Sequence, residues 1–97
     1  MNYFEIKPDG QAYIRTDSGT IIRKIGNGEV VNHAEFNRDE TLFVIAYDSG
    51  RCEIRDRKNN LVRLIAESGV KEAFFKKDGL LLVKDCEPIG DFYKFPV

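Results

Sequence analysis

The chain has 97 residues, of which 42% are hydrophobic and 32% charged, a balance typical of one globular domain covering residues 1–97. Fifteen basic and sixteen acidic side chains give a net charge of −1, which argues against a dedicated nucleic-acid binder. No apolar run reaches the roughly 18 residues that a membrane helix requires, so we expect no membrane span.

The beginning of the chain and its cysteines bear on the cellular compartment. Residues 1–9 lack the basic start and the apolar stretch of a secretion signal. The two cysteines, Cys52 and Cys86, are too few and too widely spaced for a disulfide framework or a zinc site. We therefore expect reduced thiols in a cytoplasmic protein, with Cys52 packed in the core.

The composition favours strands over helices. Val, Ile, Thr and the aromatic residues total 30, whereas Ala and Leu, the best apolar helix formers, total 11. Apolar segments separated by Gly, Asn and Asp residues predict an all-β chain of ten short strands. In chain order, their approximate ranges are 2–6, 11–16, 20–25, 30–36, 41–47, 51–56, 61–65, 70–75, 80–85 and 91–96.

Some of these segments carry a more specific pattern. Segments 41–47 and 80–85 are almost continuously apolar, which is typical of strands covered on both faces. Segment 51–56 alternates, which predicts a dry face with Cys52 and Ile54 and a wet face with Arg51, Glu53 and Arg55.

A helix competes with a strand at residues 69–77, because Val70, Ala73 and Phe74 have helical spacing. The strand interpretation of this segment depends on its position in an internal repeat, and the helix stays open as the alternative.

The chain matches itself at an offset of 39 or 40 residues. The matching pairs are Ile14 with Ile54, Arg15 with Arg55, Phe36 with Phe75, 21–25 with 61–65, and 37–39 with 76–78. This periodicity predicts repeated units of four strands, with approximate limits 1–25, 26–65 and 66–97. We expect the paired Ile and Phe residues to occupy equivalent places in the core.

The repeats resemble the blades of WD-repeat β-propellers. The similarity lies in a strand that ends in Phe before an Asp-containing turn, in a later Asp-x-Gly turn, and in a strand that ends in Asp. These features are Phe36-Asn37-Arg38-Asp39-Glu40, Phe75-Lys76-Lys77-Asp78-Gly79, Asp48-Ser49-Gly50 and Ile54-Arg55-Asp56. The resemblance implies a propeller-like arrangement of antiparallel four-stranded sheets.

The number of units predicts self-association. Two and a half units form only an incomplete ring, since propellers usually have at least four blades. We therefore expect a homo-oligomer, either a dimer or a trimer, and a β-sandwich or barrel is the alternative fold. The predicted self-association residues are the apolar ones near the end of the chain, namely Phe92, Tyr93, Phe95 and Val97.

No motif for a nucleotide, a cofactor or a metal ion is present. The single histidine, His33, has no Ser or Cys nucleophile near it in the sequence, and we interpret it as a surface or rim residue. The carboxylates lie in or beside predicted turns, where Asp is common for backbone reasons. We therefore assign no catalytic, cofactor-binding or metal-binding residue, and we do not expect an enzyme.

Arginines are the one polar feature that repeats. A locally basic set of them could contact an acidic partner or phosphates, and the competing interpretation is a solvated outer face. The candidate residues are Arg15, Arg23, Arg51, Arg55 and Arg63. The leading hypothesis is a non-enzymatic interaction module that self-associates. The alternative is a small inhibitor or immunity-type protein that binds one macromolecular partner.

Overall fold

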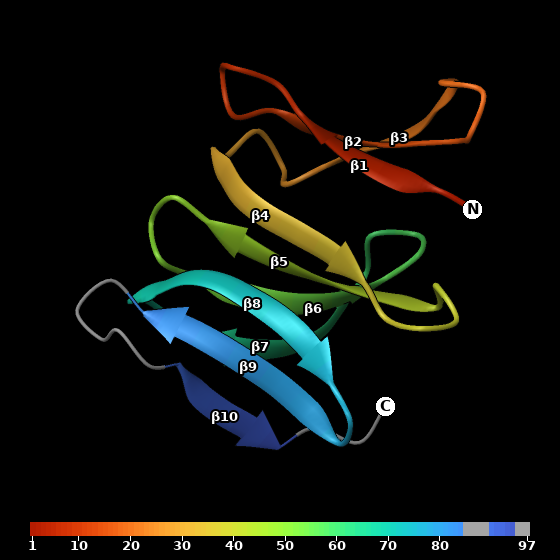
Figure 1. Ribbon diagram of the computed structural model, residues 1–97. Coiled ribbons are helices and arrows are strands. Elements are labelled where there is room, and N and C mark those ends of the chain that lie inside the picture. The colour runs from red at the N-terminus through yellow and green to blue at the C-terminus, as the bar shows by residue number, and fades with distance from the viewer. Residues whose placement is uncertain (85–89, 95–97) are drawn as a thin grey trace.

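In the computed structural model, residues 1–84 and 90–94 are described, and they form ten strands and no helix (Figure 1). The strands are β1 (Tyr3–Ile6), β2 (Ala12–Arg15), β3 (Ile21–Ile25), β4 (Val31–Phe36), β5 (Leu42–Tyr47), β6 (Cys52–Asp56), β7 (Leu61–Ala66), β8 (Val70–Lys76), β9 (Gly79–Lys84) and β10 (Asp91–Lys94). The all-β prediction is confirmed. The part of the chain described here contains no helix long and apolar enough to cross a membrane.

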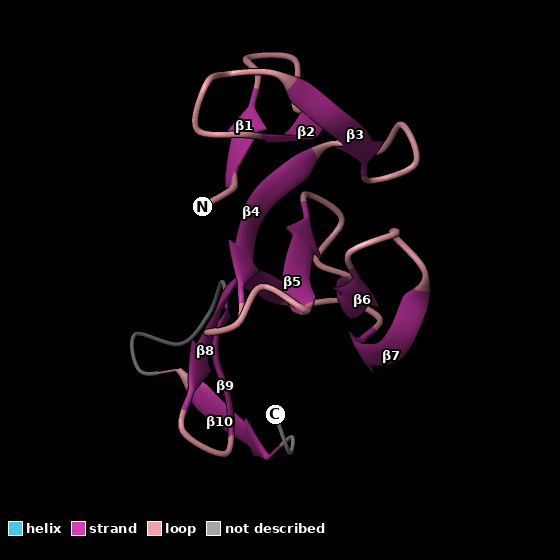
Figure 2. Ribbon diagram, turned by 90° about the vertical axis from the view of Figure 1, so that its right-hand side faces the viewer, coloured by secondary structure: helices cyan, strands magenta, loops and turns pink. Residues whose placement is uncertain are grey.

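The strands form three antiparallel sheets that lie one above the other (Figure 2). Their strand orders are β1-β2-β3, β4-β5-β6-β7 and β10-β9-β8. None of these sheets closes into a barrel. The described residues therefore form an incomplete ring of stacked open sheets, as the repeat predicts, and the sheet in the middle has four strands.

Within residues 69–77, where a helix was the alternative, the chain forms strand β8 (Val70–Lys76). A β-bulge interrupts the pairing of β8 with β9 between Val70 and Glu72. The extra residue turns Val70 and Ala73 to the same buried side of the sheet, although they are three positions apart. The helix-like spacing of these residues is therefore produced by a bulge. A bulge recurs in β4, between Val31 and His33.

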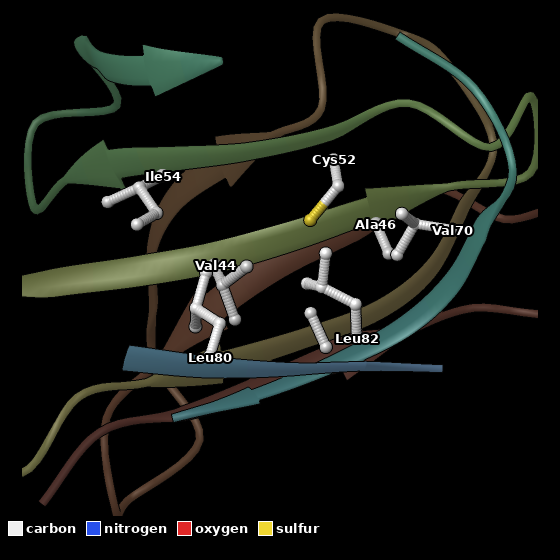
Figure 3. Close-up of a cluster of buried hydrophobic side chains, with 8 residues drawn as sticks. Val44, Ala46, Cys52, Ile54, Val70, Leu80 and Leu82 are labelled. Carbon is white, nitrogen blue, oxygen red and sulfur yellow. The ribbon is translucent and has the colours of Figure 1, made fainter. Parts of the chain in front are cut away.

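The middle sheet is covered on both faces, and a hydrophobic cluster fills each of the two gaps. Between the first and middle sheets lie Ala12, Ile14, Ile25, Val31, Phe43, Ile45 and Tyr47. Between the middle and third sheets lie Val44, Ala46, Cys52, Ile54, Val70, Ala73, Leu80 and Leu82 (Figure 3). Alternate residues of β5 enter opposite clusters, which confirms that this apolar strand is covered on both sides.

The expected core pairs are found in these clusters. Ile14 and Ile54 are buried, one in each cluster, at exposed fractions of 3% and 0%. Phe36 packs against the first cluster, with its ring 4.3 Å from the ring of Phe4, and Phe75 packs against the second. Both Phe side chains are only half-buried, because they lie at the ends of β4 and β8.

The prediction of a wet face on β6 is wrong. The alternation is present, since Cys52 and Ile54 face the third sheet. The opposite face of β6, however, is covered as well, and Glu53 and Arg55 are only 5% and 9% exposed. These two residues pair across the ladder with Ile45 and Phe43, whose side chains pack in the cluster under the first sheet.

The same backbone link joins each sheet to the next. The N–H of Val31 donates to the carbonyl of Gly10 at 2.9 Å, and the N–H of Val70 donates to that of Gly50 at 3.0 Å. Both glycines have positive φ, 85° and 92°. A Cβ on Gly50 would lie 2.4 Å from the nitrogen of Gly69, so the turn also needs glycine for space. The turns at Gly10 and Gly50 therefore fix how each sheet is positioned relative to the next.

Candidate interaction surfaces

Two of the five candidate arginines make corresponding contacts inside the fold. Arg15 donates from Nε to Glu5 at 2.7 Å and from Nη1 to the carbonyl of Gly19 at 2.5 Å. Arg55 donates from Nε to Glu53 at 2.9 Å and from Nη1 to the carbonyl of Asn59 at 2.7 Å. Each arginine therefore closes the turn that follows its own strand and pairs with one carboxylate.

A third arginine, Arg51, belongs to a charged network on the middle sheet. Its guanidinium pairs with Glu29, lies 4.5 Å from the centre of the Tyr47 ring, and has Nε 3.3 Å from Glu53. Glu53 also accepts a hydrogen bond from the Tyr47 hydroxyl at 2.8 Å, in addition to the one from Arg55. The network supplies positive charges and hydrogen bonds to the Glu53 carboxylate, which is almost completely removed from water.

The network shifts the pKa values of its members. Burial alone would raise the pKa of the Glu53 carboxyl, but hydrogen bonds from Arg55 and Tyr47, with the charges of Arg55 and Arg51, lower it. Burial and the neighbouring Glu53 carboxylate raise the pKa of the Tyr47 hydroxyl. The sheet therefore holds Glu53 ionised and Tyr47 protonated near neutral pH.

The remaining two candidates, Arg23 and Arg63, occupy matching places on the outer strands β3 and β7. These strands lie at sheet edges, on the same side of the stack (Figure 2). Their exposed apolar residues are Ile21, Ile22, Leu61, Val62 and Leu64, each 42–54% exposed. The structure therefore separates the five arginines. Arg23 and Arg63 lie on these edges, whereas Arg15, Arg51 and Arg55 contact carboxylates within the fold.

The structure describes two of the four predicted self-association residues, Phe92 and Tyr93. Phe92 on β10 is 55% exposed, and Tyr93 packs partly buried against the cluster between the middle and third sheets. Phe95 and Val97 lie outside the described residues, as does Cys86. Of the four candidates, Phe92 is thus the one that the structure describes on the surface.

A cleft of about 950 Å³ lies between corresponding turns of the middle and third sheets. Its walls come from the end of β4 with the turn after it, and from the end of β8 with the turn after it. The lining residues are Glu35, Phe36, Asn37, Arg38, Asp39, Phe75, Lys76 and Lys77. The N–H of Phe75 donates to Glu35 Oε1 at 2.9 Å and joins the two walls. We call this site the turn cleft.

The internal repeat contains a sequence signal for the turn cleft, although none of the predicted binding residues lies in it. At an offset of 39, residues 36–38 match residues 75–77, and both segments place a ring beside basic side chains. The match identifies two equivalent turns. It does not show that they face each other, because that depends on how the sheets stack.

The Cys52 thiol lies inside the molecule, and the His33 imidazole is half-buried. Cys52 is fully buried, and burial with the charge of Glu53 raises the pKa of its thiol to about 12. Figure 3 shows its sulfur pointing into the cluster between the middle and third sheets. The ring of His33 lies 4.8 Å from that of Phe74, centre to centre, so it is a half-buried packing residue. Within residues 1–84 and 90–94, no group of three or more His, Cys, Asp or Glu side chains could hold a metal ion.

No protein-family model matches this chain, and comparisons with curated proteins and with solved structures give no match either. The resemblance to WD-repeat blades therefore stays a prediction.

Proposed function

We propose that this chain is a non-enzymatic, cytoplasmic interaction module of propeller-like sheets that self-associates as a dimer through the open side of its third sheet. The observation that carries this proposal is a chemical difference between the two ends of the sheet stack. The free, buried thiol of Cys52 is compatible with a reducing compartment.

The open side of the first sheet carries charged side chains beside the phenol rings of Tyr3 and Tyr13. On β1 and β2, Phe4, Ala12 and Ile14 face the middle sheet. The alternate residues therefore face away from it. These residues include the Glu5–Arg15 ion pair and Tyr13, whose ring lies 5.4 Å from Lys7 Nζ. This end has the charged side chains of a capping unit, which remains in water in a stack of repeats.

The open side of the third sheet is apolar. Leu80 and Leu82 on β9 face the middle sheet, so Leu81 and Val83 face away from it. On the neighbouring strand β10, Phe92 is paired with Leu81 of β9, so the two side chains lie on the same side of the sheet. Its ring lies over Gly79, where an added Cβ would approach Phe92 Cζ to 2.6 Å. No sheet from the described part of the chain covers this side.

The difference between the two ends selects the type of assembly. A head-to-tail ring would place Leu81 and Phe92 of one copy against the Glu5–Arg15 pair of the next, and would remove that ion pair from water without a new partner. A two-fold arrangement packs the apolar side against its own copy. We therefore favour a dimer over a trimer.

Light scattering during size-exclusion chromatography tests this proposal. The expected mass is twice the 11.1 kDa of one chain. Phe92→Glu places a charge in the proposed interface and is expected to give the monomer. The matched control is Tyr3→Glu on the polar end of the stack, where the native side chain is 44% exposed. This variant is expected to remain dimeric.

Thermal unfolding of both variants shows whether each chain is still folded. A wild-type chain that is monomeric at micromolar concentrations contradicts the proposal and favours the alternative of a small inhibitor that binds a single partner. A folded Phe92→Glu variant that remains dimeric also contradicts it, because the interface then lies elsewhere.

A further inference from the structure

We propose that the turn cleft binds an acidic peptide segment, with carboxylate side chains on its basic rim and an apolar residue between the rings of Phe36 and Phe75. This site lies within one chain and is separate from the open side of the third sheet.

The cations of the turn cleft make no ion pairs with the described residues, whereas its carboxylates already accept hydrogen bonds. Arg38, Lys76 and Lys77 are exposed and make no ion pair with any residue that the structure describes. Glu35 accepts the N–H of Phe75, and Asp39 accepts both the hydroxyl and the N–H of Thr41. The hydrogen bonds from Thr41 also lower the pKa of Asp39. The lining thus holds three cations that make no ion pair with the described residues and two carboxylates, which leaves it a net charge of +1.

Several backbone N–H groups of the turn cleft are already hydrogen-bonded within the fold. Phosphate sites commonly use backbone N–H groups at a glycine-rich turn or a helix N-terminus. Here the N–H of Asn37 donates to Leu42, that of Glu40 donates to Asn37, and that of Phe75 donates to Glu35. These three N–H groups are not free for a ligand, so the proposed contacts are those of the exposed side chains. The planar guanidinium of Arg38 suits a carboxylate, and the two lysines add flexible point charges.

The walls of the turn cleft fit a peptide better than a free ion. Phe36 and Phe75 are half-buried, so each ring presents an apolar surface that a small anion would not cover. The volume of about 950 Å³ is at the upper end of the range for ligand sites and accommodates several side chains. Because the whole chain has a net charge of −1, acidic peptides are attracted by this local charge and not by the molecule as a whole.

Fluorescence polarisation with a labelled peptide of glutamates and aspartates around one phenylalanine tests the proposal. We expect saturable binding to the full-length chain that weakens as ionic strength rises. The double variant Lys76→Glu/Lys77→Glu should lose about tenfold or more in affinity, as expected when charge-assisted contacts are reversed. The milder pair Lys76→Gln/Lys77→Gln, which adds no repulsion, should give a smaller loss and guards against a folding defect.

The matched control is Lys24→Glu/Lys71→Glu, which changes the net charge equally at two exposed lysines outside the turn cleft. This control should bind the peptide as the wild type does. The Phe92→Glu variant should also bind normally, so the test is independent of the dimer. In a two-dimensional NMR titration, the shifts should concentrate in residues 35–39 and 75–77.

Three results would overturn the proposal. They are the absence of saturable binding, an equal loss of affinity in the control double variant, and shifts outside the turn cleft. Competition by inorganic phosphate beyond that of chloride at the same ionic strength would also reject the peptide, and would assign the cleft to a phosphate group instead.

Discussion

Glu53 is the most deeply buried charged residue that the structure describes. Its carboxylate neutralises Arg55 and lies 3.3 Å from Arg51 Nε. Glu53→Gln keeps the shape of the side chain but removes the carboxylate that pairs with Arg55, whereas Arg51 keeps its partner Glu29. Because breaking a buried ion pair typically costs about 3–5 kcal/mol, we expect a loss of that order in the free energy of unfolding at neutral pH. Urea denaturation measures it.

The loss should depend on pH. The folded protein lowers the pKa of Glu53, so the stabilisation by its ionised form is complete above the ordinary pKa of a glutamate, about 4.3, and disappears as the pH falls through the lowered value. The wild type and Glu53→Gln should therefore approach each other in stability below about pH 4. Glu67→Gln, at an exposed site, is the control and should change little. A difference that does not vary with pH contradicts this assignment.

At the scale of the element, the turn that joins β5 to β6 positions the following sheet. Gly50 and Gly19 have nearly the same φ, 92° and 90°, but different surroundings. A Cβ on Gly50 would meet the backbone of Gly69, whereas a Cβ on Gly19 has nothing within 4 Å. Gly19→Ala therefore measures the conformational cost alone, which is about 1–3 kcal/mol for such backbone.

Gly50→Ala should cost more than Gly19→Ala, because it also displaces the hydrogen bond from Val70 to Gly50 that links the middle and third sheets. The comparison of the two midpoints of thermal unfolding isolates this steric term. Equal midpoints would mean that the turn is not what sets the spacing of the sheets.

At the scale of the whole molecule, the middle sheet contributes to both hydrophobic clusters, so the three sheets should unfold together. Ile14→Ala damages one cluster and Ile54→Ala damages the other. Each should reduce the free energy of unfolding by about 2–5 kcal/mol. Each variant should still unfold in one cooperative transition that is the same by circular dichroism and by tyrosine fluorescence.

Leu61→Ala, at a side chain that is 54% exposed, is the control for the loss of the same kind of apolar group at the surface. It should cost much less than either core substitution. Two separate transitions in Ile54→Ala would show that the third sheet unfolds on its own, contrary to a single stack of cooperating layers.

The strands and turns of this protein could be predicted because their signals are local. Apolar segments interrupted by turn residues gave ranges that agree with the observed strands to within one residue wherever the structure describes both ends. The match of Ile14 with Ile54 also places both in the core, since a residue pattern that recurs in the chain recurs in the structure. The helical spacing at Val70 and Ala73 was ambiguous because a bulge imitates it.

The environments of the strand faces and of the turn cleft required the tertiary structure. Alternation along 51–56 correctly separates Cys52 and Ile54 from Glu53 and Arg55, because successive side chains of a strand point to opposite faces. Whether a face is wet depends on what packs over it, and Glu53 and Arg55 are buried in a network with Tyr47 and Arg51 that only the fold brings together. The turn cleft follows the same rule, since it exists only where two distant turns are brought together by the packing of their sheets.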